Sequence, residues 1–63
     1  MKGRVKFFNH KSKFGFIRED ETAKEYYVHQ NHVEGQIEEN DQVTFELKEE
    51  KRGPTCINVK KVD

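Results

Sequence analysis

Hydrophobic side chains recur at every second position over short runs of this chain, a spacing typical of half-buried β-strands and not of helices. The plainest run is residues 42–48, in which Val43, Phe45 and Leu47 alternate with polar side chains. Four further runs are rich in aromatic and β-branched residues and are bounded by turn residues: 3–9, 14–18, 25–30 and about 56–62. Five such short strands favour a small barrel, since closure removes the exposed edges of an open sheet.

The length of 63 residues predicts one domain spanning residues 1–63. The lone cysteine, Cys56, cannot form an internal disulfide, and Cys56 and the three histidines are too scattered to predict a zinc site. No apolar stretch approaches the roughly 20 residues of a membrane span, and no signal-peptide pattern follows the charged start. We therefore expect a monomeric cytoplasmic domain of modest stability, with no metal, no cofactor and no membrane partner.

The run at residues 3–9 contains an irregularity that affects the core. Val5 and Phe8 have opposite parity, so a regular strand cannot bury both. Either a bulge lies near Phe7 or one of the two side chains stays partly exposed. Phe7 is then expected outside and Phe8 largely inside. The other side chains predicted to form the core are Tyr26, Val28, Val33, Val43, Phe45, Ile57 and Val59, with Cys56 at its edge.

Positive and negative charges are unevenly distributed along the chain, although its formal net charge is +0. Residues 1–18 contain lysines and arginines and no acid, whereas residues 19–50 are strongly acidic. Such a chain can present one positive and one negative face, which evenly mixed charges would not do. We interpret the acidic run at residues 34–41 as a solvated loop that repels nucleic acid from that side.

Aromatic side chains share one face of two neighbouring predicted strands. Phe14 and Phe16 have the same parity, opposite to Gly15 and Ile17, and Tyr27 has the same parity as His29. Alternation alone leaves two alternatives open, since the aromatic set can face solvent or the core. If it faces solvent, the rings can stack on unpaired bases beside nearby cations, and Gly15 would let a base lie flat between the two phenyl rings.

Four segments, in order along nearly the whole chain, resemble the cold-shock domain family: Val5-Lys6-Phe7-Phe8-Asn9, Phe14-Gly15-Phe16-Ile17, Tyr27-Val28-His29, and Gly53-Pro54 through Asn58-Val59. The resemblance implies an all-β fold, a five-stranded antiparallel OB-type barrel, with the aromatic set facing solvent. It also implies the residues that contact the ligand: Lys6, Phe7, Phe14, Phe16, Tyr27, His29 and Arg52. We add Lys13 as a candidate phosphate contact.

The chain departs from the family pattern at several of these positions. Phe7 stands where the family usually has tryptophan, Ser12-Lys13 where it has lysine-glycine, and Gln30 where it has an aromatic residue. The connection after Val33 is short and offers no phenylalanine. Because stacking contributes ~1–3 kcal/mol per base, we expect weaker binding than is typical of the family.

These features predict a protein that binds single-stranded RNA or DNA and acts as an RNA chaperone related to cold-shock adaptation. The alternative is a protein-interaction module that kept the barrel but lost much of its base-stacking surface, as Gln30 and the zero net charge suggest. No nucleophile–base pair or carboxylate cluster predicts an enzyme or a small-molecule substrate.

Overall fold

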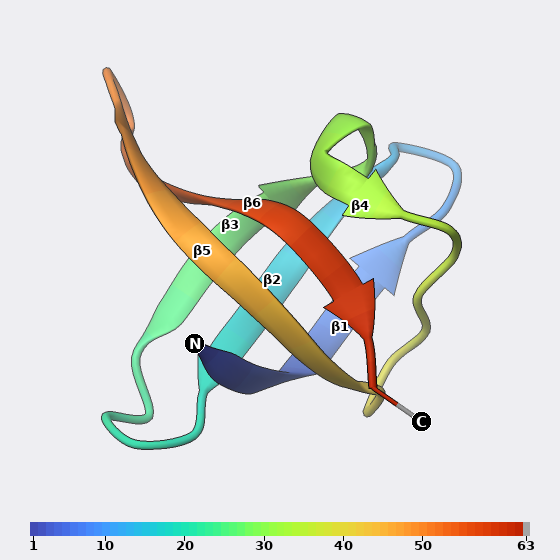
Figure 1. Cartoon of the computed structure of the whole chain (residues 1–63). Coiled ribbons are helices and arrows are strands. Elements are labelled where there is room, and N and C mark those ends of the chain that lie inside the picture. Colours follow the sequence, from blue (N-terminus) through green and yellow to red (C-terminus); the bar gives the residue numbers. More distant parts are fainter. Residues whose placement is uncertain (63) are drawn as a thin grey trace.

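Residues 1–62, which the computed structural model describes, form six β-strands and a short 3-10 helix (Figure 1). The elements in chain order are β1 (Lys2–Asn9), β2 (Phe14–Glu19), β3 (Glu25–His29), the 3-10 helix η1 (Gln30–His32), β4 (Val33–Glu34), β5 (Gln42–Glu50) and β6 (Gly53–Lys61). The five longer strands are the predicted ones, and β4 is a two-residue addition beside β6. The predicted five-stranded barrel is confirmed.

The strands form one sheet in the order β3-β2-β1-β5-β6-β4, and a pairing between β3 and β6 closes it. The predicted antiparallel arrangement holds for β1–β2, β2–β3, β1–β5 and β5–β6. The closure is different, because Tyr27 and Val28 of β3 pair in parallel with Thr55 and Cys56 of β6. A parallel pair needs a long crossover, and residues 30–52 supply it.

Of the two alternatives for β1, the structure shows the bulge. The register of β1 against β2 shifts between Val5 and Phe7, which makes Lys6 the extra residue. Val5 is fully buried, Phe8 packs partly buried against the core, and Phe7 is 37% exposed. The bulge therefore places Lys6 and Phe7 together on the outer surface.

The predicted orientation of β6 was wrong at two positions. Cys56 is fully buried with Val59, whereas Ile57 is only partly buried. Asn58 between them has a φ of 51°, and the β5–β6 register shifts opposite this point, between Thr44 and Glu46. One extra residue in β6 reverses the parity of the strand and directs Cys56 inward.

The rest of the core follows the prediction in part. Val28, Val43, Phe45 and Val59 are buried, while Tyr26 and Val33 are half-buried and pack against the core from its edge. Ile37, in the connection between β4 and β5, is fully buried and was not predicted. No periodic pattern surrounds Ile37 that would have marked it as a core residue.

Burial raises the pKa of the Cys56 thiol from 9.0 to about 12. As the pH rises above 9.0, the pKa of an ordinary thiol, the unfolded chain releases the thiol proton while the folded chain retains it. The unfolded state is therefore favoured increasingly at high pH, and this contribution to stability is lost between about pH 9 and 12.

Replacing Cys56 by alanine is expected to flatten the decline of stability at alkaline pH. The free energy of unfolding of the wild type should fall by up to ~1.4 kcal/mol per pH unit more than that of Cys56→Ala above about pH 9. Urea unfolding at several pH values measures both slopes. Lysine titration is common to the two proteins, so equal slopes would contradict the assignment.

Candidate nucleic-acid interface

Four aromatic rings from three adjacent strands lie on the outside of the barrel and form the aromatic face: Phe7 of β1, Phe14 and Phe16 of β2, and Tyr27 of β3. Phe16 lies between Phe7 and Tyr27 in the strand register. Gly15 and Ile17 are buried, so β2 directs its phenylalanines away from the core. The alternative in which these rings face the core is therefore wrong.

The rings of the aromatic face support one another. Phe7 lies 5.5 Å from Phe16 and 6.3 Å from Phe14, measured between ring centroids. Tyr27 lies 5.9 Å from Phe14 in a stacked arrangement and 6.1 Å from Phe16 edge to face. Such pairs contribute ~0.5–1.5 kcal/mol each beyond area burial. Little side-chain entropy remains to be lost when a flat ligand stacks on them.

Gly15 serves the packing of β1 on β2, which corrects the role expected for it. A Cβ atom on Gly15 would lie 2.2 Å from the carbonyl oxygen of Phe7 and 2.8 Å from the Cα atom of Phe8. Both atoms belong to the backbone of β1. The missing side chain lets the two strands approach, and it does not open a space for a base between Phe14 and Phe16.

His29 continues the aromatic face at the end of β3, where it pairs across the sheet with Phe14. Its Nδ1 accepts a hydrogen bond of 3.1 Å from the backbone N–H of Asn31 and so caps η1. In the neutral ring, the proton then resides on Nε2. His29 can therefore offer a donor to a ligand while its ring orientation stays fixed.

The predicted cationic residues lie around the aromatic face in three different settings. Lys6 on the bulge forms a 2.7 Å ion pair with Glu25. Lys13 lies in the β1–β2 turn, where its carbonyl accepts the backbone N–H of Gln30 at 2.9 Å. Arg52 lies in the β5–β6 turn. The structure thus places Lys13 beside the His29 end of the face and leaves Lys6 partly neutralised.

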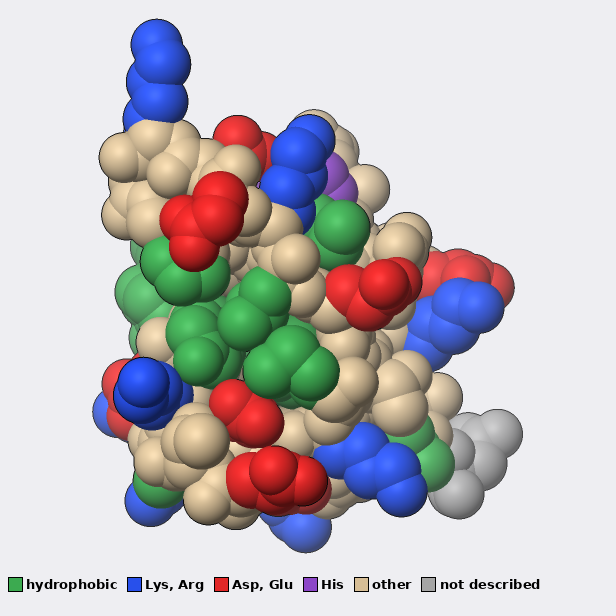
Figure 2. All heavy atoms as spheres, turned by 60° about the vertical axis from the view of Figure 1, so that its left-hand side comes forward, with side chains coloured by type: hydrophobic (Ala, Val, Ile, Leu, Met, Phe, Trp, Pro, Cys, Tyr) green, Lys and Arg blue, Asp and Glu red, His purple; other side chains and the backbone are tan. Residues whose placement is uncertain are grey.

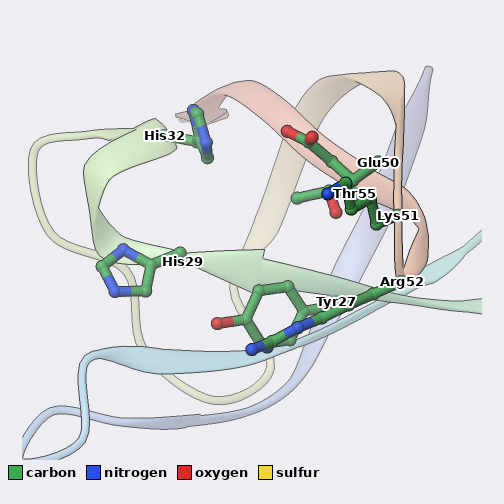
Figure 3. A pocket seen from close by; sticks show the side chains of 7 residues that line it. All are labelled: Tyr27, His29, His32, Glu50, Lys51, Arg52 and Thr55. Carbon is green, nitrogen blue, oxygen red and sulfur yellow. The ribbon is translucent and has the colours of Figure 1, made fainter.

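Arg52 meets Tyr27 and His29 at a hollow of about 390 Å³ (Figure 3). The full lining is Tyr27, His29, His32, Glu50, Lys51, Arg52 and Thr55. Sequence reasoning predicted three of these residues and missed the others. Glu50 and Lys51 adjoin Arg52 in the sequence, but His32 is brought to the hollow by η1, which no pattern predicted.

Gln30 provides a polar contact where the family pattern has an aromatic ring. Its side-chain amide donates a 3.1 Å hydrogen bond to the carbonyl of Gly35. This bond holds the start of η1 to the connection that follows β4. Gln30 therefore orders the chain beside His29 and adds no ring to the aromatic face.

A different side of the barrel carries hydrophobic side chains among charges of both signs. Figure 2 turns the left-hand side of Figure 1 forward and shows these hydrophobic side chains with acidic and basic side chains around them. Tyr26 and Leu47 are partly buried hydrophobic residues at the core edge, and Met1 is 49% exposed. The acidic groups on this side repel phosphates. The aromatic face is the better interface.

Lys13 has a left-handed backbone with a φ of 64°, at the position where the family pattern has glycine. We expect Lys13→Gly to raise the free energy of unfolding by ~0.5–1 kcal/mol, because left-handed strain outweighs the greater entropy of glycine in the unfolded chain. The same change removes a cation and should weaken oligonucleotide binding about twofold to fivefold. Thermal unfolding and a binding titration measure the two effects.

Lys11 in the same turn provides the matched control, since its φ is not positive. Lys11→Gly should lower stability, as expected for glycine at an ordinary backbone position. A stabilising effect of equal size at both positions would contradict the strain at Lys13.

Within residues 1–62, no helix is long and apolar enough to cross a membrane. The same residues contain no group of three or more histidine, cysteine, aspartate or glutamate side chains that could hold a metal ion.

Comparisons with known proteins agree with the geometry. The model of the 'Cold-shock' DNA-binding domain matches residues 1–62. The cold shock protein CspD of Bacillus subtilis is 42% identical over 64 residues, which cover 95% of this chain and 96% of that protein. The cold shock-like protein CspC of Buchnera aphidicola is 35% identical over 63 residues, covering 94% and 91% respectively.

A solved structure gives the same fold. The structure of Drosophila Unr CSD456 superposes with a TM-score of 0.79 and 23% identity, covering 98% of this chain and 26% of that one. At this level of identity the likeness supports the barrel fold alone.

Proposed function

Because the chain belongs to the cold-shock DNA-binding domain family, we propose that it binds single-stranded RNA or DNA by stacking bases on its aromatic face. The observation that carries this proposal is the set of four mutually packed rings on the outside of the barrel. The proposed contact residues are Lys6, Phe7, Lys13, Phe14, Phe16, Tyr27, His29 and Arg52.

The chemistry of the face suits an unpaired strand better than a duplex. Each unpaired base offers a flat surface to a ring, and stacking contributes ~1–3 kcal/mol per base with little dependence on sequence. Lys6, Lys13 and Arg52 surround the rings and can meet phosphates. The bases of a duplex are already stacked on one another and do not offer these surfaces.

Preferential binding to single strands gives the proposed RNA chaperone activity. A ligand that binds the open form of an RNA hairpin and not the closed form shifts the equilibrium toward the open form by mass action. No energy source is required. RNA secondary structure becomes more stable as temperature falls, so the activity would be most useful during cold adaptation.

A titration with fluorescently labelled oligothymidine tests the proposal. The chain contains no tryptophan, so the label on the oligonucleotide must report binding. We expect saturable binding that weakens with salt, with a log–log slope of ~0.7 per phosphate contacted. Absence of binding at millimolar protein and low salt would overturn the proposal.

A protein-interaction module is the second candidate function. The hydrophobic side chains among charges of both signs in Figure 2 favour it, because an exposed apolar patch with a charged rim can receive a protein partner. A folded protein that fails to bind oligothymidine would support this candidate over the first.

Glu25→Gln is expected to strengthen oligonucleotide binding about twofold to fivefold. The 2.7 Å ion pair occupies Lys6, and removing the carboxylate charge makes the ammonium group available to a phosphate. The salt dependence should steepen by ~0.7 at the same time. Binding titrations at several salt concentrations measure both changes. Glu21→Gln, in the exposed β2–β3 turn, is the control, and equal strengthening there would point to net charge alone.

A further inference from the structure

The hollow in Figure 3 extends the aromatic face toward η1 and the β5–β6 turn. Tyr27 belongs to both, because its ring packs on Phe14 and Phe16 and also lines the hollow. A strand stacked on the aromatic face therefore reaches the hollow directly. The volume of about 390 Å³ lies in the range of small-ligand sites and can accommodate one nucleotide unit.

The charges around the hollow suit a phosphate. Lys51 and Arg52 supply two positive charges and Glu50 supplies one negative charge. His29 and His32 add two imidazoles, whose ring nitrogens can donate hydrogen bonds to a phosphate. The charged side chains of the hollow are thus net positive.

His32 is available to a ligand. It ends η1 and is held in place because the next residue, Val33, pairs with Val59 of β6. Figure 3 shows its ring on one side of the hollow, with Tyr27 and Arg52 on the other. No group among residues 1–62 hydrogen-bonds to this ring, in contrast to His29, whose Nδ1 caps η1. The backbone of η1 therefore sets the position of His32, and both of its ring nitrogens lack a partner among residues 1–62.

We propose that this hollow binds one nucleotide unit of the single strand and that His32 contacts its phosphate together with Lys51 and Arg52. The inference rests on the proposed function and adds to it a contact residue and a dependence on pH. Protonated imidazole forms a charge-assisted hydrogen bond with phosphate, which neutral imidazole does not.

The surroundings of His32 set the direction of the pH effect. Its ring also lines a smaller hollow on the β4 side, where Glu34 is the charged neighbour. The titratable and charged groups that share these two hollows with His32 are Tyr27, His29, Glu34, Glu50, Lys51 and Arg52. A lower pH favours the protonated form of imidazole, which is the form that gives phosphate a charge-assisted hydrogen bond. Binding should tighten as pH falls.

The test measures the dissociation constant of labelled heptathymidine at about pH 8 and pH 6 at constant ionic strength. The wild type should bind about twofold to fivefold tighter at the lower pH. In His32→Gln, the change in the logarithm of the dissociation constant between pH 8 and pH 6 should be at most half of the wild-type change. His10→Gln is the matched control, because His10 contacts Glu38 outside the hollow, and it should keep the full gain.

A second pair of variants gives an effect of the opposite sign. Glu50→Gln removes the negative charge from the hollow and should tighten binding about twofold to fivefold at both pH values. A misfolded variant would bind more weakly, so tighter binding cannot result from misfolding. Glu49→Gln makes the same change outside the hollow and should leave affinity unchanged.

The outcomes separate this inference from the proposed function. Binding with a full pH dependence in His32→Gln, or equal effects of Glu49→Gln and Glu50→Gln, would overturn the inference alone. Failure of the wild type to bind heptathymidine at either pH would overturn the proposed function and the inference with it.

Discussion

Replacing Phe14 and Phe16 together by alanine is expected to weaken oligothymidine binding by about 30-fold to 10⁴-fold. Each ring can stack one base, at ~1–3 kcal/mol per base, and the two rings are the centre of the aromatic face. Titration of labelled oligothymidine at low salt measures the loss. An affinity within threefold of the wild type would contradict the stacking role.

The double alanine variant also removes ring contacts that support the barrel, so its stability must be measured in parallel. Phe14 and Phe16 are half-buried and pack on Phe7 and Tyr27. The paired change to leucine is the better-matched variant, because leucine keeps most of the apolar volume and lacks a flat ring. We expect the leucine pair to unfold at nearly the wild-type temperature and still to lose most of the binding.

Gly15→Ala is expected to prevent folding. The added Cβ atom would lie 2.2 Å from the carbonyl oxygen of Phe7, and a backbone atom in a paired strand cannot move aside without breaking the β1–β2 ladder. An extra methylene in a core that can relax costs ~1–3 kcal/mol, and a clash with the backbone of a paired strand exceeds this range because the strands must separate. A domain of this size has only ~3–5 kcal/mol of stability to lose. Circular dichroism and a thermal scan should show an unfolded chain.

Gly35→Ala separates this clash from ordinary backbone strain. Gly35 has a φ of 80°, but a Cβ atom there would meet nothing within 4 Å. The cost should be only the ~1–2 kcal/mol of a left-handed residue with a side chain. A cooperative thermal transition is therefore expected for Gly35→Ala, and a similar transition for Gly15→Ala would contradict the assigned clash.

Alternation in the sequence predicted the strands, because these depend on which neighbouring residues share a face. The opposite parity of Val5 and Phe8 indicated a bulge near Phe7 as one of two alternatives, and the structure shows that Lys6 is the extra residue. Alternation could not choose the outward orientation of Phe14 and Phe16, which the prediction took from the family resemblance and the buried Ile17 bears out.

The features that the sequence did not predict depend on contacts between distant segments. The left-handed Asn58 reverses the parity of β6 through a shift in its pairing with β5. Asparagine tolerates a left-handed backbone, but its presence alone does not indicate where the pairing shifts. Ile37 is buried although it lies in the connection between β4 and β5, where hydrophobic residues do not recur at a regular spacing. His32 reaches the candidate site because β4 pairs with β6 and so fixes η1. In each case tertiary packing overrides the local pattern.

The parallel pairing between β3 and β6 also has a consequence for the order of folding. The strands β1, β2 and β3 follow one another through short turns, whereas Tyr27 and Val28 must find Thr55 and Cys56 across the whole crossover. Loop-closure entropy disfavours such distant contacts until the nearby ones have formed. We therefore expect the contacts of the β1–β2–β3 meander to form before the contacts of this seam. Tyr27 lies on β3 and Arg52 in the turn that precedes β6, so the hollow that both side chains line is complete only in the closed barrel.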